Sequence, residues 1–165
     1  MGFSGVLGHE FVGQVESVHD DADKSFIGQR VCGEINVVCG SCHECEQGGD
    51  MKRNHCSKRG VVGILGYDGV YSEYIALPIS NLHVIPASIS DERAVFVEPL
   101  AAACRILEQG LIKPDDKVAV LGDGKLGVLC AAVAAHHVSS KLNVKVMQSS
   151  STSLLKPCHK VPSMP

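Results

Sequence analysis

Residues 117–137 read KVAVLGDGKLGVLCAAVAAHH, and this stretch decides the fold class of the chain. Its first part, KVAVLG (117–122), is a compact apolar run of the length of a strand. The chain then turns at glycines and continues as an alanine-rich run to His137, which predicts a helix. A strand, a glycine turn and a helix form the first half of a βαβ unit.

The glycines of this turn, Gly122, Gly124 and Gly127, have the spacing G-x-G-x-x-G. Between a strand and a helix, such glycines let backbone amides at the helix N-terminus hold a pyrophosphate. The flanking elements carry this interpretation, because the pattern alone also occurs elsewhere. The stretch therefore predicts a dinucleotide-phosphate site.

The preceding segment, SDERAVFVEPLAAACRILEQG (90–110), predicts helices, with Ser90 as an N-cap and Gly110 as the C-terminal stop. Within it, Glu98 precedes Pro99. Pro99 fits the first position of a helix, where the helix dipole favours a preceding carboxylate. From the residues alone, that structural role of Glu98 and a role in a functional site both remain open.

Several short strands with glycine turns are indicated nearer the N-terminus. The expected strand segments are FVGQVESV (11–18), a turn and strand in GQRVCGEINVV (28–38), GVYSEYIALP (69–78) and NLHVIP (81–86). Together they predict a small β-barrel or sandwich.

Four cysteines interrupt this β region, in CGSCHECEQGGDMKRNHC (39–56, hereafter the cysteine lobe). Cys39, Cys42 and Cys45 are separated by two-residue gaps, and Cys56 follows on a returning loop. Zinc takes four ligands in a tetrahedron, and thiolate sulfur suits it. Four cysteines leave no position for water, so the expected zinc site is structural rather than catalytic.

A pair of disulfides, or a redox Cys-x-x-Cys, is the alternative for the cysteine lobe. A redox pair of the thioredoxin type lies at a helix start after a strand, which this glycine- and charge-rich segment does not resemble. In a reducing compartment clustered cysteines more often hold metal. His43 and His55 could act as substitute ligands, although four cysteines suffice.

The composition excludes several function classes. The 165 residues carry a net charge of −3 and no basic run, so we expect neither nucleic-acid nor membrane binding. The longest apolar run is too short to span a bilayer. The N-terminus lacks the pattern of a secretory signal, which favours a cytoplasmic location.

From Gly8 to about Ala135 the chain resembles the zinc-dependent medium-chain alcohol and polyol dehydrogenases. The motifs that carry this resemblance are GHEFVGQVESV, the cysteine lobe, DGVYSEYIALP, VEPLAAA and VAVLGDGKLG. EPLA is most similar to the sorbitol and threonine dehydrogenases. The resemblance implies a mixed α+β fold: a partial GroES-like β-barrel over residues 1–90, then the first βα unit of an incomplete Rossmann domain over 91–138.

The resemblance also implies roles for individual residues. His9 would be a ligand of a catalytic zinc, with Glu10 beside the metal and Glu98 supplying a carboxylate. The four cysteines would hold a separate structural zinc, and the three glycines would line the pyrophosphate of NAD or NADP. In this family zinc acts as a Lewis acid on the alcohol oxygen, and hydride passes to the nicotinamide. Family members usually form dimers or tetramers and act on small alcohols or polyols.

The chain departs from the family pattern at both ends. The family takes a catalytic-zinc cysteine from well before GHE, whereas GHE begins here at Gly8, and Cys32 follows the motif. The ten residues between Cys45 and Cys56 exceed the usual spacing. That extra loop closure costs only ~0.3 kcal/mol, against roughly 10 kcal/mol or more from binding a structural zinc.

A Rossmann unit also needs a second strand that ends in Asp or Glu. NVKVM (143–147) is a candidate, but Gln148, Ser149 and Ser150 follow it, and serines there would favour NADP over NAD. Our preferred interpretation is a disordered, non-family tail over residues 139–165, because the final segment is serine-rich and has no hydrophobic period.

We therefore expect a zinc-dependent NAD(P) oxidoreductase of the alcohol or polyol dehydrogenase type, truncated at both ends and catalytically impaired. The alternative is a non-catalytic zinc-binding fragment that associates with a full-length dehydrogenase subunit. The expected partners are a small alcohol or polyol, and a second copy of the chain or a full-length relative. A third hypothesis is a thiol redox protein, but it leaves the GHE and GDGKLG motifs unexplained.

Overall fold

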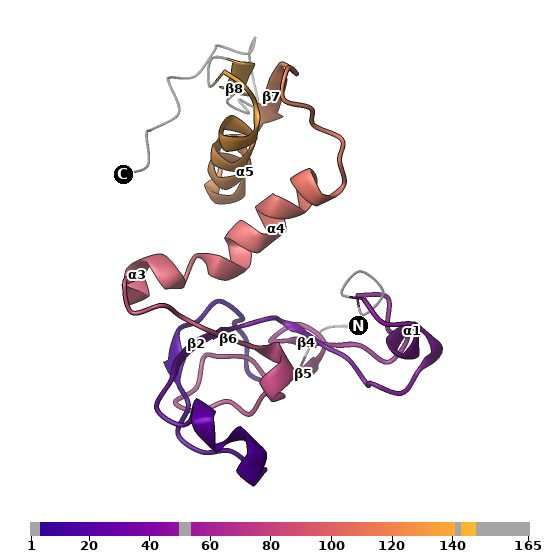
Figure 1. Cartoon of the computed structure of the whole chain (residues 1–165), viewed down its shortest axis with the longest axis vertical. Coiled ribbons are helices and arrows are strands. Elements are labelled where there is room, and N and C mark those ends of the chain that lie inside the picture. The colour runs from indigo at the N-terminus through magenta and orange to yellow at the C-terminus, as the bar shows by residue number, and fades with distance from the viewer. Residues whose placement is uncertain (1–3, 50–53, 141–142, 148–165) are drawn as a thin grey trace. The chain divides into compact units, whose positions relative to one another are not determined.

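The structure is a computed structural model that describes residues 4–49, 54–140 and 143–147. The chain divides into two compact units, Met1–Glu98 and Pro99–Pro165. Each unit is described separately below, and Figure 1 labels the elements along the chain.

The first unit contains an antiparallel sheet with the strand order β1-β2-β6. Its strands are β1 (Gly13–Gln14), β2 (Arg30–Gly33) and β6 (Leu82–Val84). A short 3-10 helix, η1 (Asp21–Phe26), lies between β1 and β2. The hydrophobic core of this unit is built around the buried residues Cys32, Ile85 and Ala94.

A second small sheet has the order β3-β4-β5, with β3 (Asn36–Val37), β4 (Gly60–Val62) and β5 (Gly66–Tyr67). β3 pairs antiparallel with β4, and β4 pairs parallel with β5. The cysteine lobe, with its short helix α1 (His43–Glu46), lies between β3 and β4 in the chain. The sheet pairing therefore holds the two ends of the lobe together.

Asn81, at the end of the 3-10 helix η2 (Ile79–Asn81), is the buried polar residue of the described chain, at 1% exposure. Its amide nitrogen donates to the carbonyl oxygens of Glu34 at 2.8 Å and Asn36 at 2.9 Å. Because a buried polar side chain needs hydrogen-bond partners, these two bonds tie Asn81 to the turn between β2 and β3.

The β region differs from the prediction in extent. The expected strand 11–18 is a strand only at β1, and the single strand expected in 28–38 is split into β2 and β3. The expected strand 69–78 is wrong in the part of the chain that the structure describes. Residues 69–71 hydrogen-bond to residues 6–8, and Ser72 Oγ then donates to the carbonyl of Tyr74 at 2.7 Å, which bends the chain out of a ladder.

The predicted helical segment 90–110 forms two helices. Ser90 is the N-cap of α3 (Asp91–Ala94), and α4 (Val97–Glu108) ends before Gly110, which has a positive φ of 66°. Pro99 is the third residue of α4 rather than the first. The first-turn N–H groups of a helix have no partner within the helix, so a proline is tolerated there too.

The second unit contains a βαβ arrangement: β7 (Val118–Leu121), α5 (Lys125–His137) and β8 (Val144–Met147). β7 and β8 are parallel, with Val118 opposite Val144 and Leu121 opposite Met147. This confirms the strand and the helix predicted from residues 117–137, because a parallel pair requires a crossover helix of this kind.

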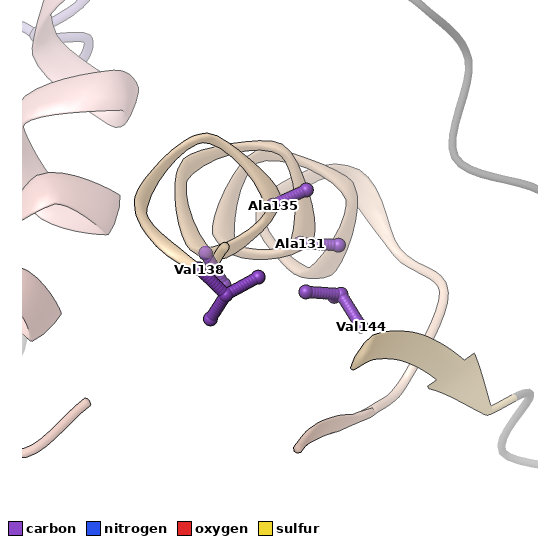
Figure 2. Packing of buried hydrophobic residues seen from close by; sticks show 5 residues of the cluster. Ala131, Ala135, Val138 and Val144 are labelled. Atoms are coloured by element: carbon purple, nitrogen blue, oxygen red, sulfur yellow. The ribbon is translucent and has the colours of Figure 1, made fainter. Parts of the chain in front are cut away.

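Small side chains let α5 lie close to this strand pair. Figure 2 shows Ala131 and Ala135 on α5, with Val138 just after the helix and Val144 at the start of β8; with Ala134 these residues form one buried cluster. Val118, Val120 and Val146 pack against the cluster from the strands.

β8 differs from the predicted disordered tail, which includes residues 144–147. Val144 is 6% exposed, and the strand pairs with β7 along its length. The alternation of V-K-V-M places Val144 and Val146 toward α5 and stabilises the pairing. Residues 148–165 of the predicted tail lie outside the described residues.

Candidate metal centres and glycine turn

The four sulfurs of the cysteine lobe converge on one point. Cys42 Sγ lies 3.5 Å from Cys45 Sγ and 3.7 Å from Cys56 Sγ, and Cys56 Sγ lies 3.6 Å from Cys39 Sγ. All four lie within 4.8 Å of one another. α1 begins directly after Cys42 and carries Cys45, so one helical turn sets the spacing of these two.

These distances fit a tetrahedral metal ion. Four sulfurs at about 2.3 Å from zinc lie about 3.8 Å apart, close to the observed spacing. A disulfide requires about 2.05 Å, and all four cysteines are unbonded. Neither His43 nor His55 belongs to this cluster. The structure therefore brings together the four residues that the sequence predicts as ligands.

The thiols of the cysteine lobe differ in acidity. A hydrogen bond from the Ser41 backbone lowers the pKa of Cys39 to about 6. The Cys45 backbone lowers the pKa of Cys42, but Glu44, desolvation and the adjacent sulfurs raise it more, to about 12. Crowded sulfurs resist ionising together, and a divalent cation removes that resistance.

A second cluster consists of His9, Glu10 and Glu98, whose ligand atoms all lie within 4.8 Å of one another. His9 and Glu10 precede β1, whereas Glu98 lies in the first turn of α4. The structure thus joins the GHE and VEPLAAA motifs, which contain these residues.

Cys32 does not belong to this cluster. It lies in the core at 5% exposure, and its thiol faces the His83 carbonyl at 3.8 Å. Burial raises the pKa of this thiol.

Close backbone packing holds the GHE segment in place. A Cβ atom on Gly63 or on Gly69 would lie 2.3 Å from the carbonyl oxygen of Gly8, a contact that real Cβ atoms do not make. Gly8 itself has a φ of +94°, and the ring of Tyr71 covers it. Sequence reasoning missed Gly63 and Gly69, because nothing in their local sequence indicates which distant backbone they touch.

The carboxylate of Glu98 lies in an electrostatically unfavourable place. Desolvation by burial raises its pKa; nearby His9 lowers it, and the negative charges of Glu10 and Glu34 raise it further. A bound cation would relieve both burial and repulsion. Glu34 is a site neighbour that sequence reasoning also missed, and its carboxylate accepts a hydrogen bond from the backbone N–H of Asn36 at 2.8 Å.

The glycine turn between β7 and α5 has the geometry that its spacing predicts. Gly122 has a φ of +104°, Gly124 is the N-cap of α5, and a Cβ atom on Gly127 would lie 2.1 Å from the Gly122 carbonyl oxygen. Only glycine at 127 lets the helix start lie this close to the strand end. The amides at the start of α5 are thereby available to a phosphate.

No helix in the described ranges is long and apolar enough to cross a bilayer.

These features define a class of protein in which a β unit with two candidate metal centres precedes a βαβ unit with a glycine turn. A family model for the alcohol dehydrogenase GroES-like domain matches residues 2–87. L-threonine 3-dehydrogenase of Coxiella burnetii is 38% identical over 131 residues, which are 79% of this chain and 36% of that protein. The chain belongs to the medium-chain alcohol and polyol dehydrogenase family.

Solved structures agree with this assignment. The dehydrogenase rspB of Escherichia coli CFT073, complexed with NADH, matches with a TM-score of 0.75 and 34% identity over 85% of this chain and 40% of its own. A structure described as a zinc-binding dehydrogenase from Sinorhizobium meliloti 1021, bound to NADP, has a TM-score of 0.72 and 31% identity, covering 88% and 41%. The predicted fold class and family resemblance are confirmed, and the chain spans about 36% of the length of its curated relative.

Proposed function

We propose that this chain is the metal-binding part of a zinc-dependent NAD(P) oxidoreductase that oxidises the CH–OH group of a small alcohol or polyol. The observation that carries the proposal is the presence of both ligand clusters within one unit: four sulfurs at tetrahedral spacing, and His9 with Glu10 and Glu98. Family membership supplies the reaction type.

Each site residue has a proposed role. Cys39, Cys42, Cys45 and Cys56 hold a structural zinc, which ties the returning loop to α1. His9 and Glu98 are the ligands of a catalytic zinc, and Glu10 supplies a further negative charge beside it. When bound, zinc acts as a Lewis acid on the alcohol oxygen and the nicotinamide accepts the hydride.

The second unit is proposed to bind the nucleotide. Gly122, Gly124 and Gly127 leave the start of α5 open, so that its amides can hold the pyrophosphate of NAD or NADP. The unpaired thiols of the cysteine lobe suit a reducing compartment, and we place the protein in the cytoplasm.

Metal analysis of the purified, zinc-reconstituted chain tests the proposal. We expect about one tightly held zinc per chain and a second, weaker one. Cys45→Ser should abolish the tight site, and His9→Ala should abolish the weak site alone. Cys104→Ser, outside both clusters, is the matched control and should retain both ions. A chain that binds no zinc and contains oxidised cysteine pairs would refute the proposal and favour the redox reading.

The activity itself is proposed to be impaired in this chain, because the described His9–Glu10–Glu98 cluster contains no thiolate ligand. Steady-state assays of the zinc-loaded chain with NAD or NADP and a panel of secondary alcohols and polyols measure this. Turnover comparable to that of an intact relative would overturn it.

One observation favours the second function, association with a full-length dehydrogenase subunit or with a second copy. Leu121 of β7 is 74% exposed, and Leu126 of α5 is 53% exposed. Parallel sheets are usually covered on both faces, so this apolar surface suits a protein partner. Co-purification with an intact subunit would support this function.

A further inference from the structure

Cys56 reaches the four-sulfur cluster from a different segment than the other three cysteines. Cys39, Cys42 and Cys45 lie within residues 39–45, and the last of them is on α1, whereas ten residues separate Cys45 from Cys56. Local turns therefore place the first three sulfurs, but the position of Cys56 depends on contacts of the returning segment. Because a four-thiolate ion is released as its ligands leave one after another, the ligand that is held least firmly limits how long the ion stays.

The chain that follows Cys56 is fixed by the small sheet. The backbone N–H of Arg59 donates to the carbonyl oxygen of Cys56 at 3.1 Å, and β4 begins at the next residue, Gly60. Gly60 lies opposite Val37 of β3, two residues before Cys39 in the chain. The backbone N–H of Cys39 in turn faces the sulfur of Cys56 at 3.5 Å. These contacts hold Cys56 from its C-terminal side.

The side chain of Arg59 holds the chain that precedes Cys56. Its Nη1 atom donates to the carbonyl oxygen of Asn54 at 2.7 Å. Arg59 thus bonds to the chain on both sides of the ligand, through its backbone to Cys56 itself and through its side chain to the residue two positions earlier. A guanidinium is always charged, and charge-assisted hydrogen bonds are stronger than neutral ones.

We propose that Arg59 is a positioning residue for the structural zinc: its side chain holds residues 54–56 so that Cys56 stays among the ligands, and it thereby slows release of the ion. Groups that orient metal ligands from outside change metal affinity by about 10–100-fold. Arg59 contacts backbone rather than sulfur, so we expect an effect at the lower end. The inference rests on the proposed structural zinc and is independent of the proposed catalytic zinc and of the oxidoreductase activity.

A competing explanation is that Arg59 acts through its charge alone, since a cation near thiolates favours them. Salt weakens the interaction of charges that are separated by solvent, whereas a direct hydrogen bond to a neutral carbonyl depends little on it. The chain offers a matched control for charge, because Lys58 is the adjacent residue and is exposed, whereas Arg59 is half-buried.

Transfer of zinc from the reconstituted chain to excess pyridylazoresorcinol, with a reductant present, tests the proposal. Arg59→Met keeps most of the side-chain length but removes its donors, and should release the tightly held zinc about tenfold faster at unchanged stoichiometry. Lys58→Ala should release it as the unmodified chain does. The cobalt-substituted form of Arg59→Met should retain the absorption of a tetrahedral four-sulfur site, because all four ligands remain.

Hydrogen exchange of the β2 and β6 amides, in the other sheet of the first unit, separates positioning from unfolding and should be unchanged in Arg59→Met. Equal release by Arg59→Met and the unmodified chain would overturn the proposal. Equal acceleration by Lys58→Ala, disappearance of the difference at about 0.5 M salt, or a general loss of protection in β2 and β6 would overturn it as well. An unmodified chain that holds no tight zinc would refute the structural zinc together with this inference, whereas the other outcomes leave the structural zinc in place.

Discussion

At Gly69 the backbone lies so close to Gly8 that hydrogen is the largest side chain that fits. Gly63 makes the same approach from the end of β4. His9 and Glu10 follow Gly8 directly, so the position of two proposed metal-site residues depends on two glycines far from them in sequence. A backbone contact of this kind controls a site without contributing an atom to it.

Gly69→Ala should therefore both destabilise the first unit and disturb the second metal cluster. We expect a loss of about 1–3 kcal/mol in the free energy of unfolding, which is typical of overpacking, together with weaker zinc binding at His9. Urea denaturation and metal titration measure the two effects. Gly13→Ala is the matched control, since its Cβ would meet only the Phe11 ring at 3.7 Å. Equal behaviour of the two variants would contradict the packing argument.

The raised pKa of Glu98 predicts a pH dependence in the metal-free chain. The folded chain keeps this proton where the unfolded chain has lost it, so the contribution to stability is complete below the usual carboxyl pKa of 4.5. It is lost as the pH rises through the raised pKa of the folded state. Metal-free wild type should thus lose stability relative to Glu98→Gln as the pH rises above 4.5.

Urea denaturation across pH in the presence of a chelator measures this difference. Glu92 provides the contrast, because its own backbone amide and Ser90 lower its pKa. The difference between wild type and Glu92→Gln should have the opposite sign, with wild type favoured above the usual carboxyl pKa. Adding zinc should remove the penalty at Glu98, and a pH-independent difference between wild type and Glu98→Gln would refute the assignment.

Residue types and spacing indicated the four cysteines as candidate zinc ligands, and the family resemblance indicated His9, Glu10 and Glu98; the structure brings each set together. Thiolates at two-residue gaps converge through local turns, so the cysteine lobe could be inferred without knowing the fold. Glu34 and Gly69 could not be found in this way. Their roles depend on contacts between segments distant in the chain, and a single sequence does not specify such contacts.

At the scale of elements, the start of α5 depends on one glycine. Gly127→Ala gains up to about 1 kcal/mol in helix propensity, but its Cβ would meet the Gly122 carbonyl oxygen at 2.1 Å. We expect the clash to dominate, with a net loss of about 1–3 kcal/mol. Hydrogen exchange of the α5 and β7 amides measures the effect within the second unit.

Gly124→Ala is the control for this substitution. Nothing lies within 4 Å of its Cβ position, so the cost should be limited to a poorer N-cap, about 1 kcal/mol or less. Comparable loss of protection in both variants would show that the glycine contact is not what holds α5 against the strand end.

The predictability of the elements follows their local signals. β7 and α5 were predictable because an apolar run, glycines and alanines mark them within the sequence. The segment 69–78 alternates like a strand but lacks a partner, since a ladder requires a second edge at the right distance. The sequence predicted a tail at β8, because V-K-V-M is a weak strand signal with serines around it. In the structure, the pairing of β8 with β7 outweighs that signal.

At the scale of the whole molecule, family and fold class followed from five motifs, and the family match over residues 2–87 confirms them. The packing of the GHE segment against Gly63 and Gly69 was not predictable, because it joins backbone segments that are distant in the chain. The sequence therefore indicated the family of this protein better than the contacts between its segments.

The spacing of the four sulfurs has a consequence for handling the protein in air. The Ser41 backbone lowers the pKa of Cys39 to about 6, which favours its thiolate form, and the sulfur of Cys56 lies 3.6 Å away. Thiolates react with oxidants far more readily than thiols, and adjacent ones cross-link. An ion shared by all four sulfurs occupies the electron pairs that would react. If the metal is removed without a reductant present, the cysteines would thus oxidise, and zinc added later would no longer restore the site.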